Sequence, residues 1–132
     1  MGNPLGRLER RFDFLRVAAT RCRQVTPAFI IQAAPSDKVD SPARIGFTAS
    51  RKVGIAVKRN RAKRRLRALA NSVLSKIALS ETDYVIIARQ TTPAHPFHLM
   101  ERDLRKAVAK INKSLSISVT KSTSNTSNGE KR

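Results

Sequence analysis

The chain contains few of the residues that form redox centres, membrane spans or base-stacking surfaces. Its 132 residues include one cysteine, Cys22, one tyrosine, Tyr84, and no tryptophan. A single cysteine excludes an internal disulfide and fits a reducing compartment such as the cytoplasm. No apolar run approaches the roughly 20 residues of a membrane-spanning helix, and the opening MGNPLGRLERR lacks the apolar segment of a signal peptide. We therefore predict a cytoplasmic protein with no membrane partner.

Acidic residues are also scarce, which limits the chemistry that the chain can perform alone. There are nine of them against 27 Lys and Arg, so the formal net charge is +18. A metal-dependent nuclease needs clustered carboxylates that hold Mg²⁺ and aim a water molecule. The nine acidic residues form no recognisable ligand motif in the sequence. We predict no catalytic residue and no metal ligand in this chain.

The positive charge is concentrated in residues 51–67, RKVGIAVKRNRAKRRLR. Nine of these 17 residues are Lys or Arg, and none is acidic. Apolar residues at helical spacing run through the segment and beyond it, which predicts a packed helix over 55–79. They are Ile55, Ala62, Leu66, Leu69, Val73 and Ile77. Because the charge is carried by a folded element, its natural partner is a polyanion such as a nucleic acid.

The composition favours RNA over DNA as that partner. Readers of DNA sequence usually carry a helix-turn-helix or a dimer element, and neither is visible. With one tyrosine, no tryptophan and five phenylalanines, the chain cannot stack many bases, so phosphate and shape contacts should dominate. We expect no DNA partner.

The remaining pattern predicts an α+β domain with one crossover. Phe12, Leu15 and Ala19 have helical spacing within residues 9–20. Strands are predicted over 23–26, 28–34, 44–50 and 83–89, with 83–89 central and parallel to 44–50, and a final helix over 97–111. Residues 1–8 are predicted to form a flexible arm, 9–112 the domain, and 113–132, rich in Ser, Thr, Asn and Lys, a disordered tail.

The segment KVGIAVKRNRAKRRLR resembles the signature of the bacterial ribonuclease P protein component. RIGFTASRK before it and DYVIIAR after it extend the resemblance over about residues 7–112. The family implies a two-layer α/β sandwich in αβββαβα order, with a four-stranded mixed sheet. It also implies a left-handed βαβ crossover, although general topology rules favour the opposite hand.

The same resemblance implies a function. The chain would be the protein subunit of a ribonucleoprotein endoribonuclease that removes the 5′ leader of precursor tRNA. Its partners would be the catalytic RNA subunit and precursor tRNA. The RNA subunit would hold the catalytic Mg²⁺, and the protein alone would bind no cofactor.

Two sets of residues match the binding surfaces of the family. The set implied to bind the RNA subunit is Arg51, Lys52, Lys58, Arg59, Asn60, Arg61, Lys63, Arg64, Arg65 and Arg67. The set implied to bind the leader in a cleft between the first helix and the sheet is Phe14, Ala18, Ile30, Gln32, Thr48 and Ser50. Family members often carry aromatic residues where this chain has Ala18 and Gln32, so base stacking should be weaker here. Phe14 is equally well explained as a core residue, and Thr48 and Ser50 as an ordinary solvent face.

Two other functions compete with this interpretation. The composition fits a structural RNA-binding protein of the ribosomal type with no role in cleavage. An autonomous ribonuclease would need two groups that act as acid and base, and the two histidines, His95 and His98, are the candidates.

Overall fold

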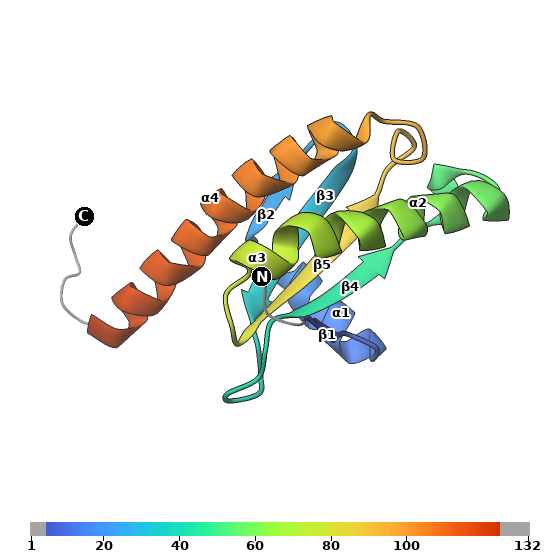
Figure 1. Cartoon of the computed structure of the whole chain (residues 1–132). Coiled ribbons are helices and arrows are strands. Elements are labelled where there is room, and N and C mark those ends of the chain that lie inside the picture. The colour runs from blue at the N-terminus through green and yellow to red at the C-terminus, as the bar shows by residue number, and fades with distance from the viewer. Residues whose placement is uncertain (1–4, 125–132) are drawn as a thin grey trace.

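A five-stranded mixed sheet forms the centre of the protein, in a computed structural model that describes residues 5–124 (Figure 1). The strand order is β1-β4-β5-β3-β2. The bounds are β1 (Gly6–Arg7), β2 (Arg23–Val25), β3 (Phe29–Pro35), β4 (Arg44–Thr48) and β5 (Thr82–Ala88). β5 is central, parallel to β4 and antiparallel to β3, which confirms the predicted pairing and position of this strand.

The predicted count of four strands is wrong, because the N-terminal segment adds a fifth. Gly6 and Arg7, assigned from sequence to a flexible arm, pair in parallel with Arg44 and Ile45 of β4. A segment of two residues is too short to show the alternation of polar and apolar side chains that marks a strand. Gly6 and Arg7 form a strand because they pair with the edge of β4. Residues 1–4 of the predicted arm lie outside the described residues.

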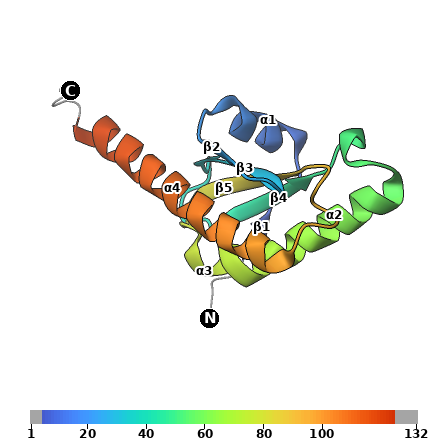
Figure 2. The same ribbon diagram turned by 90° about the horizontal axis from the view of Figure 1, so that it is seen from above.

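Helices cover both faces of the sheet, so the predicted two-layer sandwich is also wrong. α1 (Arg11–Ala19) lies alone on one face (Figure 2). The other face is covered by α2 (Ala56–Leu69), the π-turn η2 (Ala70–Leu74), α3 (Ser75–Ile77) and α4 (Phe97–Ser124). Apart from β1 and short turns, the elements follow the predicted αβββαβα order.

α2, η2 and α3 form one nearly continuous helix in place of the helix predicted over 55–79. Ala62, Leu66, Leu69 and Val73 are fully or almost fully buried, which confirms the predicted apolar stripe. Ile55, its first member, is instead 68% exposed. The reason is local: Gly54 has a φ of 140°, where L side chains rarely fit, and the chain turns there so that Ile55 lies just outside the helix as its N-cap.

α4 continues to Ser124, twelve residues beyond the predicted end of the domain at 112. Leu115 is 9% exposed and belongs to the main core with Leu104 and Ile111. Residues 113–124 are therefore helical rather than a disordered tail, and residues 125–132 lie outside the described residues. The sequence signal was weak because the segment is Ser-rich and its apolar residues, Leu115, Ile117 and Val119, stand two apart, which is not helical spacing.

The two faces of the sheet have cores of different size. Phe29, Ile31, Tyr84 and Ile86 pack against α2 and α4 in the larger one. The smaller one, beneath α1, contains Leu8, Val17, Ala34 and Val85.

α1 turns an unexpected side toward the sheet. Phe12 and Leu15, whose spacing predicted the helix, are 59% and 55% exposed. Asp13 and Val17 are the buried residues of this helix. A buried carboxylate requires cationic or hydrogen-bonding partners.

Candidate RNA-binding surfaces

The basic signature forms a turn followed by a helix. Arg51 and Lys52 lie exposed in the 3-10 turn η1 (Arg51–Val53). The Ser50 hydroxyl caps this turn by accepting a hydrogen bond from the Lys52 N–H at 3.3 Å. Gly54 then allows α2 to start in a new direction. The basic residues of η1 and of α2 are therefore close to one another on the surface.

The outer side of α2 carries positive charge without internal compensation. Among the residues implied to bind the RNA subunit, those exposed on α2 are Lys58, Asn60, Arg61, Arg64 and Arg67. In the part of the chain that the structure describes, no Lys or Arg of η1 or α2 forms a salt bridge. We call the ten residues of this set, with Arg51 at one end and Arg67 at the other, the α2 basic surface.

Several arginines of this surface are also tied to the fold. The Arg59 guanidinium donates to the Gly54 carbonyl at 3.0 Å, and Arg61 Nε donates to the Pro93 carbonyl at 2.9 Å. The Arg67 guanidinium lies 5.9 Å from the centre of the Phe47 ring, a cation–π distance. Such contacts limit the rotamers of these side chains.

Arg65 is turned inward more than its neighbours. It donates to the His95 carbonyl and lies 5.8 Å from the centre of the Phe97 ring, which joins α2 to the start of α4. Burial, and then the positive charge of Arg61, lower the pKa of Arg65. Arg65 therefore has a clear structural role, and its RNA contact stays a prediction.

On the opposite face of the sheet, one row of side chains is left uncovered beside α1. Thr48 and Ile30 are the register partners of Ile87 on either side, and Val25 pairs with Ile30. Register partners project to the same face, and Ile87 packs against the core beneath α1. Thr48, Ile87 and Ile30 are half-buried, and Val25 is 57% exposed. We call these four residues the α1-side row.

Phe14 lies next to this row, above Gly46 of β4, where the strand carries no side chain. A Cβ added to Gly46 would lie 2.6 Å from Cε2 and Cζ of the Phe14 ring. Gly46 thus provides the seat of the ring, and Phe14 is half-buried rather than fully enclosed. Phe14 packs on the sheet and stays partly exposed.

The structure brings most of the predicted leader-binding residues to this face. Ala18 is exposed on α1, and Ser50 is exposed just beyond β4. Gln32 is 7% exposed and lies one row deeper, opposite Val85, so it offers little surface to a ligand. Sequence reasoning missed Ile87 and Val25. The alternation of Val85 and Ile87 in β5 marks their shared face, but only the register shows that Ile87 continues the row.

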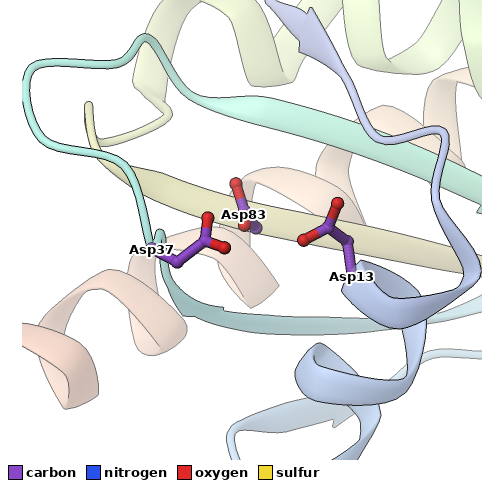
Figure 3. Close-up of side chains that lie close together, drawn as sticks. All are labelled: Asp13, Asp37 and Asp83. Atoms are coloured by element: carbon purple, nitrogen blue, oxygen red, sulfur yellow. The ribbon is translucent and has the colours of Figure 1, made fainter.

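Three carboxylates converge at the other end of this face, where α1 meets the sheet (Figure 3). Asp13, Asp37 and Asp83 each place an oxygen within 4.8 Å of the others. Sequence analysis treated the acidic residues as scattered, because these three are far apart in the chain and only the fold unites them. Their geometry raises the question of a metal site.

Arginines occupy the space between these carboxylates. Arg44 donates two hydrogen bonds to Asp83, one from Nε at 2.8 Å and one from Nη2 at 2.7 Å. The same Nη2 donates to an Asp37 oxygen at 3.1 Å. Arg16 contacts both Asp83 and Asp13. Carboxylates held by guanidinium groups offer no free set of oxygen ligands, so the donor set does not fit a divalent cation.

Arg10 completes the group, which we call the aspartate–arginine cluster (Asp13, Asp37, Asp83, Arg10, Arg16 and Arg44). Burial alone would raise the pKa of Asp13. The hydrogen bond and charge of Arg10, the charge of Arg44 and a hydrogen bond from Arg16 outweigh burial and lower this pKa below its ordinary value. The cluster therefore clamps α1 to β4 and β5 and fixes the position of Phe14 over the sheet.

The two histidines have different surroundings. His95 is half-buried in the loop before α4, and its carbonyl accepts the hydrogen bond from Arg65. His98 is exposed in the first turn of α4. No hydrogen bond joins their side chains within residues 5–115, so the structure does not assemble them as an acid–base pair.

A basic helix surface on one side of a sheet and a half-apolar face on the other define a nucleic-acid-binding protein. No described helix is both long and apolar enough to cross a membrane. Comparison with known proteins narrows the class: the family model for ribonuclease P matches residues 3–112. The chain belongs to the ribonuclease P protein family.

Individual relatives agree with this assignment. The chain is 45% identical over 114 residues to the ribonuclease P protein component of Paramagnetospirillum magneticum, covering 84% of this chain and 86% of the relative. The ribonuclease P protein component of Ruegeria pomeroyi is 44% identical over 106 residues, 79% of this chain and 84% of the relative.

Solved structures match the fold. The RNase P protein of Staphylococcus aureus superposes with a TM-score of 0.64 at 26% identity, covering 83% of this chain and 97% of that chain. The RNase P protein from Thermotoga maritima has a TM-score of 0.65 at 22% identity, covering 79% and 96%. The latter likeness concerns the fold alone.

Proposed function

We propose that this chain, as the protein component of ribonuclease P, docks on the catalytic RNA through the α2 basic surface. We further propose that it holds the 5′ leader of precursor tRNA on the α1-side row. In this proposal the protein assists leader removal and the RNA subunit supplies the catalytic groups and their Mg²⁺. The observation that carries the proposal is the α2 basic surface, with nine cationic side chains and no salt bridge among the described residues.

Electrostatics supports the docking surface. Phosphate oxygens accept bidentate hydrogen bonds from Arg, and each phosphate that is neutralised releases counterions. Arg64 is exposed on the side of α2 opposite the buried Ala62 and Leu66, so it can reach a phosphate at no cost to the fold. Asn60 lies on the same outer side and can bond a ribose or a backbone group.

The α1-side row suits a single strand with unpaired bases. Its half-buried aliphatic side chains and the ring of Phe14 offer apolar contact, while Thr48 and Ser50 offer hydroxyl groups. Stacking on one aromatic ring contributes about 1–3 kcal/mol per base. Ala18 adds no stacking, so Phe14 carries this term alone in the proposed leader contact.

Two finer expectations belong to the same proposal. The crossover from β4 through α2 to β5 is expected to be left-handed, as the resemblance implies, and an experimental structure tests it. The cytoplasm is the expected site of action, which the free thiol of Cys22 supports.

Charge reversal on α2 tests the docking surface. Arg64→Glu should weaken binding to the catalytic RNA and lower the slope of log affinity against log salt by about one unit. Lys38→Glu is the matched control, because Lys38 is exposed in the loop at the opposite end of the sheet and changes the net charge equally. Filter binding over a salt series measures both, and urea unfolding should show unchanged stability.

Three results would contradict the proposal. Equal weakening by Lys38→Glu would show that net charge, rather than the α2 basic surface, determines binding. Cleavage of precursor tRNA by the chain without RNA would assign catalysis to the protein. Co-purification with ribosomal RNA in place of one catalytic RNA would favour the structural RNA-binding alternative.

A further inference from the structure

A small hollow lies at the outer edge of the sheet, between β2 and α4. Its volume is about 150 Å³, and its lining includes Gln24 and Thr26 from the β2 side and Lys106 and Lys110 from α4. β2 is the last strand in the sheet order, so its outer backbone edge has no partner strand among the described residues. Val25 of the α1-side row also lines this β2–α4 hollow, and its other lining residues belong to none of the surfaces described above.

The hollow carries uncompensated positive charge. Lys106 and Lys110 are exposed and stand four residues apart, so they are neighbours on one side of α4. Asp103 also lines the hollow, but its carboxylate pairs with Arg102 at 3.3 Å. Within the described residues neither lysine forms a salt bridge. Two ammonium groups at the mouth of a polar hollow suit an anion the size of a phosphate group.

The α1-side row leads to this hollow. The row crosses β4, β5, β3 and β2, a width of roughly 14 Å at the usual strand spacing, and it ends at the exposed Val25. Arg23 is exposed on the same face of β2, two residues before Val25. Gln24, between them, points to the other face and lines the hollow. A ligand that follows the row therefore leaves the sheet over β2, next to Lys106 and Lys110.

We propose that the β2–α4 hollow binds a backbone phosphate of single-stranded RNA, and that this RNA is the upstream part of the leader after it has crossed the sheet. Lys106 and Lys110 pair with the phosphate, and the Gln24 amide donates a hydrogen bond to it. This inference rests on the proposed function, because it extends the leader path beyond the α1-side row. A phosphate of the catalytic RNA has the same chemistry, and leader length separates the two sources.

The test uses holoenzyme reconstituted from the full chain and the catalytic RNA, with precursor tRNAs whose leaders increase in length. The double variant Lys106→Gln/Lys110→Gln is compared with Lys38→Gln/Lys76→Gln. The control removes two exposed lysines that do not line the hollow. Thermal unfolding of both variants verifies that the fold is intact. Affinity for each precursor is measured between about 50 and 200 mM salt.

Only leaders long enough to pass β2 should respond to the loss of Lys106 and Lys110. In the unaltered protein the affinity ratio of long to short leaders should fall about 2.6-fold across that salt range, for one phosphate contact on a single strand. In the hollow variant this ratio should become independent of salt, and short leaders should bind as before. The control should behave like the unaltered protein.

Three outcomes would overturn the inference. They are an unchanged response to long leaders, an equal loss for short and long leaders with weaker binding of the catalytic RNA, and an equal loss in the control. Phe14→Ala distinguishes these from failure of the proposed function. Suppose Phe14→Ala weakens short-leader binding while the lysine variant changes nothing. The proposal that the leader binds on the α1-side row is then retained, and the proposal that the β2–α4 hollow binds a phosphate is refuted. If Phe14→Ala leaves every leader unaffected, the proposed leader face itself fails.

Discussion

The contact between Gly46 and Phe14 gives the sharpest test of how the leader face is built. In Gly46→Ala the new Cβ would lie 2.6 Å from two atoms of the Phe14 ring and 3.2 Å from Leu8 Cβ. Since heavy atoms in packed proteins do not approach so closely, the ring must leave its seat. Overpacking of this kind costs about 1–3 kcal/mol of unfolding free energy. The backbone itself gives no reason for strain, because Gly46 lies within the regular strand β4.

The displaced ring should also lose its contact with the leader. We expect Gly46→Ala to reduce the preference for precursor over mature tRNA toward the level of Phe14→Ala. If Phe14 stacks on one base, the loss is about 1–3 kcal/mol, or about five- to 150-fold in affinity. Affinity for the catalytic RNA should not change, because neither residue belongs to the α2 basic surface.

A double-mutant cycle separates the ring contact from every other effect of the new methyl group. Four proteins are needed: the unaltered chain, Gly46→Ala, Phe14→Ala and the double variant. When residue 14 is alanine, the second change should cost less than about 1 kcal/mol, because only the Leu8 contact remains tight. Urea unfolding and precursor binding provide the two readouts. If Gly46→Ala lowers the unfolding free energy and precursor binding equally whether residue 14 is Phe or Ala, the proposed packing of the Phe14 ring on Gly46 is refuted.

Two further predictions concern charge. Arg65→Ala should lower the unfolding free energy by about 1–3 kcal/mol, because the hydrogen bond to His95 and the Phe97 contact are lost. Arg64→Ala should change it by less than about 0.5 kcal/mol, and equal losses in urea unfolding would contradict the inward role of Arg65. Because folding lowers the pKa of Asp13, its stabilising contribution is complete above the ordinary value of 3.8 and is lost as the pH falls below it. Asp13→Asn should therefore reduce the decline of the unfolding free energy in acid, measured by urea unfolding at constant ionic strength. An unaltered decline would show that the ionised Asp13 carboxylate does not cause it.

The order of elements was predictable because its signals are local. Alternation marks β4, helical spacing marks α2, and an uninterrupted apolar run marks the central β5. The fifth strand was not predictable, since Gly6 and Arg7 become a strand only when β4 offers a free edge. The extension of α4 depends on Leu115 reaching the core. The Ser-rich sequence around Leu115 does not indicate that this residue is buried.

The candidate sites also contain features that could be predicted from the sequence and features that could not. The α2 basic surface was predictable because its residues are contiguous, whereas the orientation of α1 was not. Helical spacing favoured Phe12 and Leu15 as the inner side, but ion pairing placed Asp13 there. Its partner Arg44 is remote in sequence. Apolar periodicity located this helix but could not predict the orientation of a helix that is held by buried charge.

Under the proposed function, the contrast between buried and exposed arginines determines which of them would pair with RNA. Arg44 and Arg16 hold Asp83, whose side chain is 0% exposed. To meet a phosphate they would leave a buried carboxylate unpaired, which typically costs about 3–5 kcal/mol. Arg64 has no such partner among the described residues, so its pairing with a phosphate gains counterion release without breaking an internal contact. The fold thus places three of its nine acidic residues where they hold α1, and among the described residues this leaves the arginines of α2 without a salt bridge.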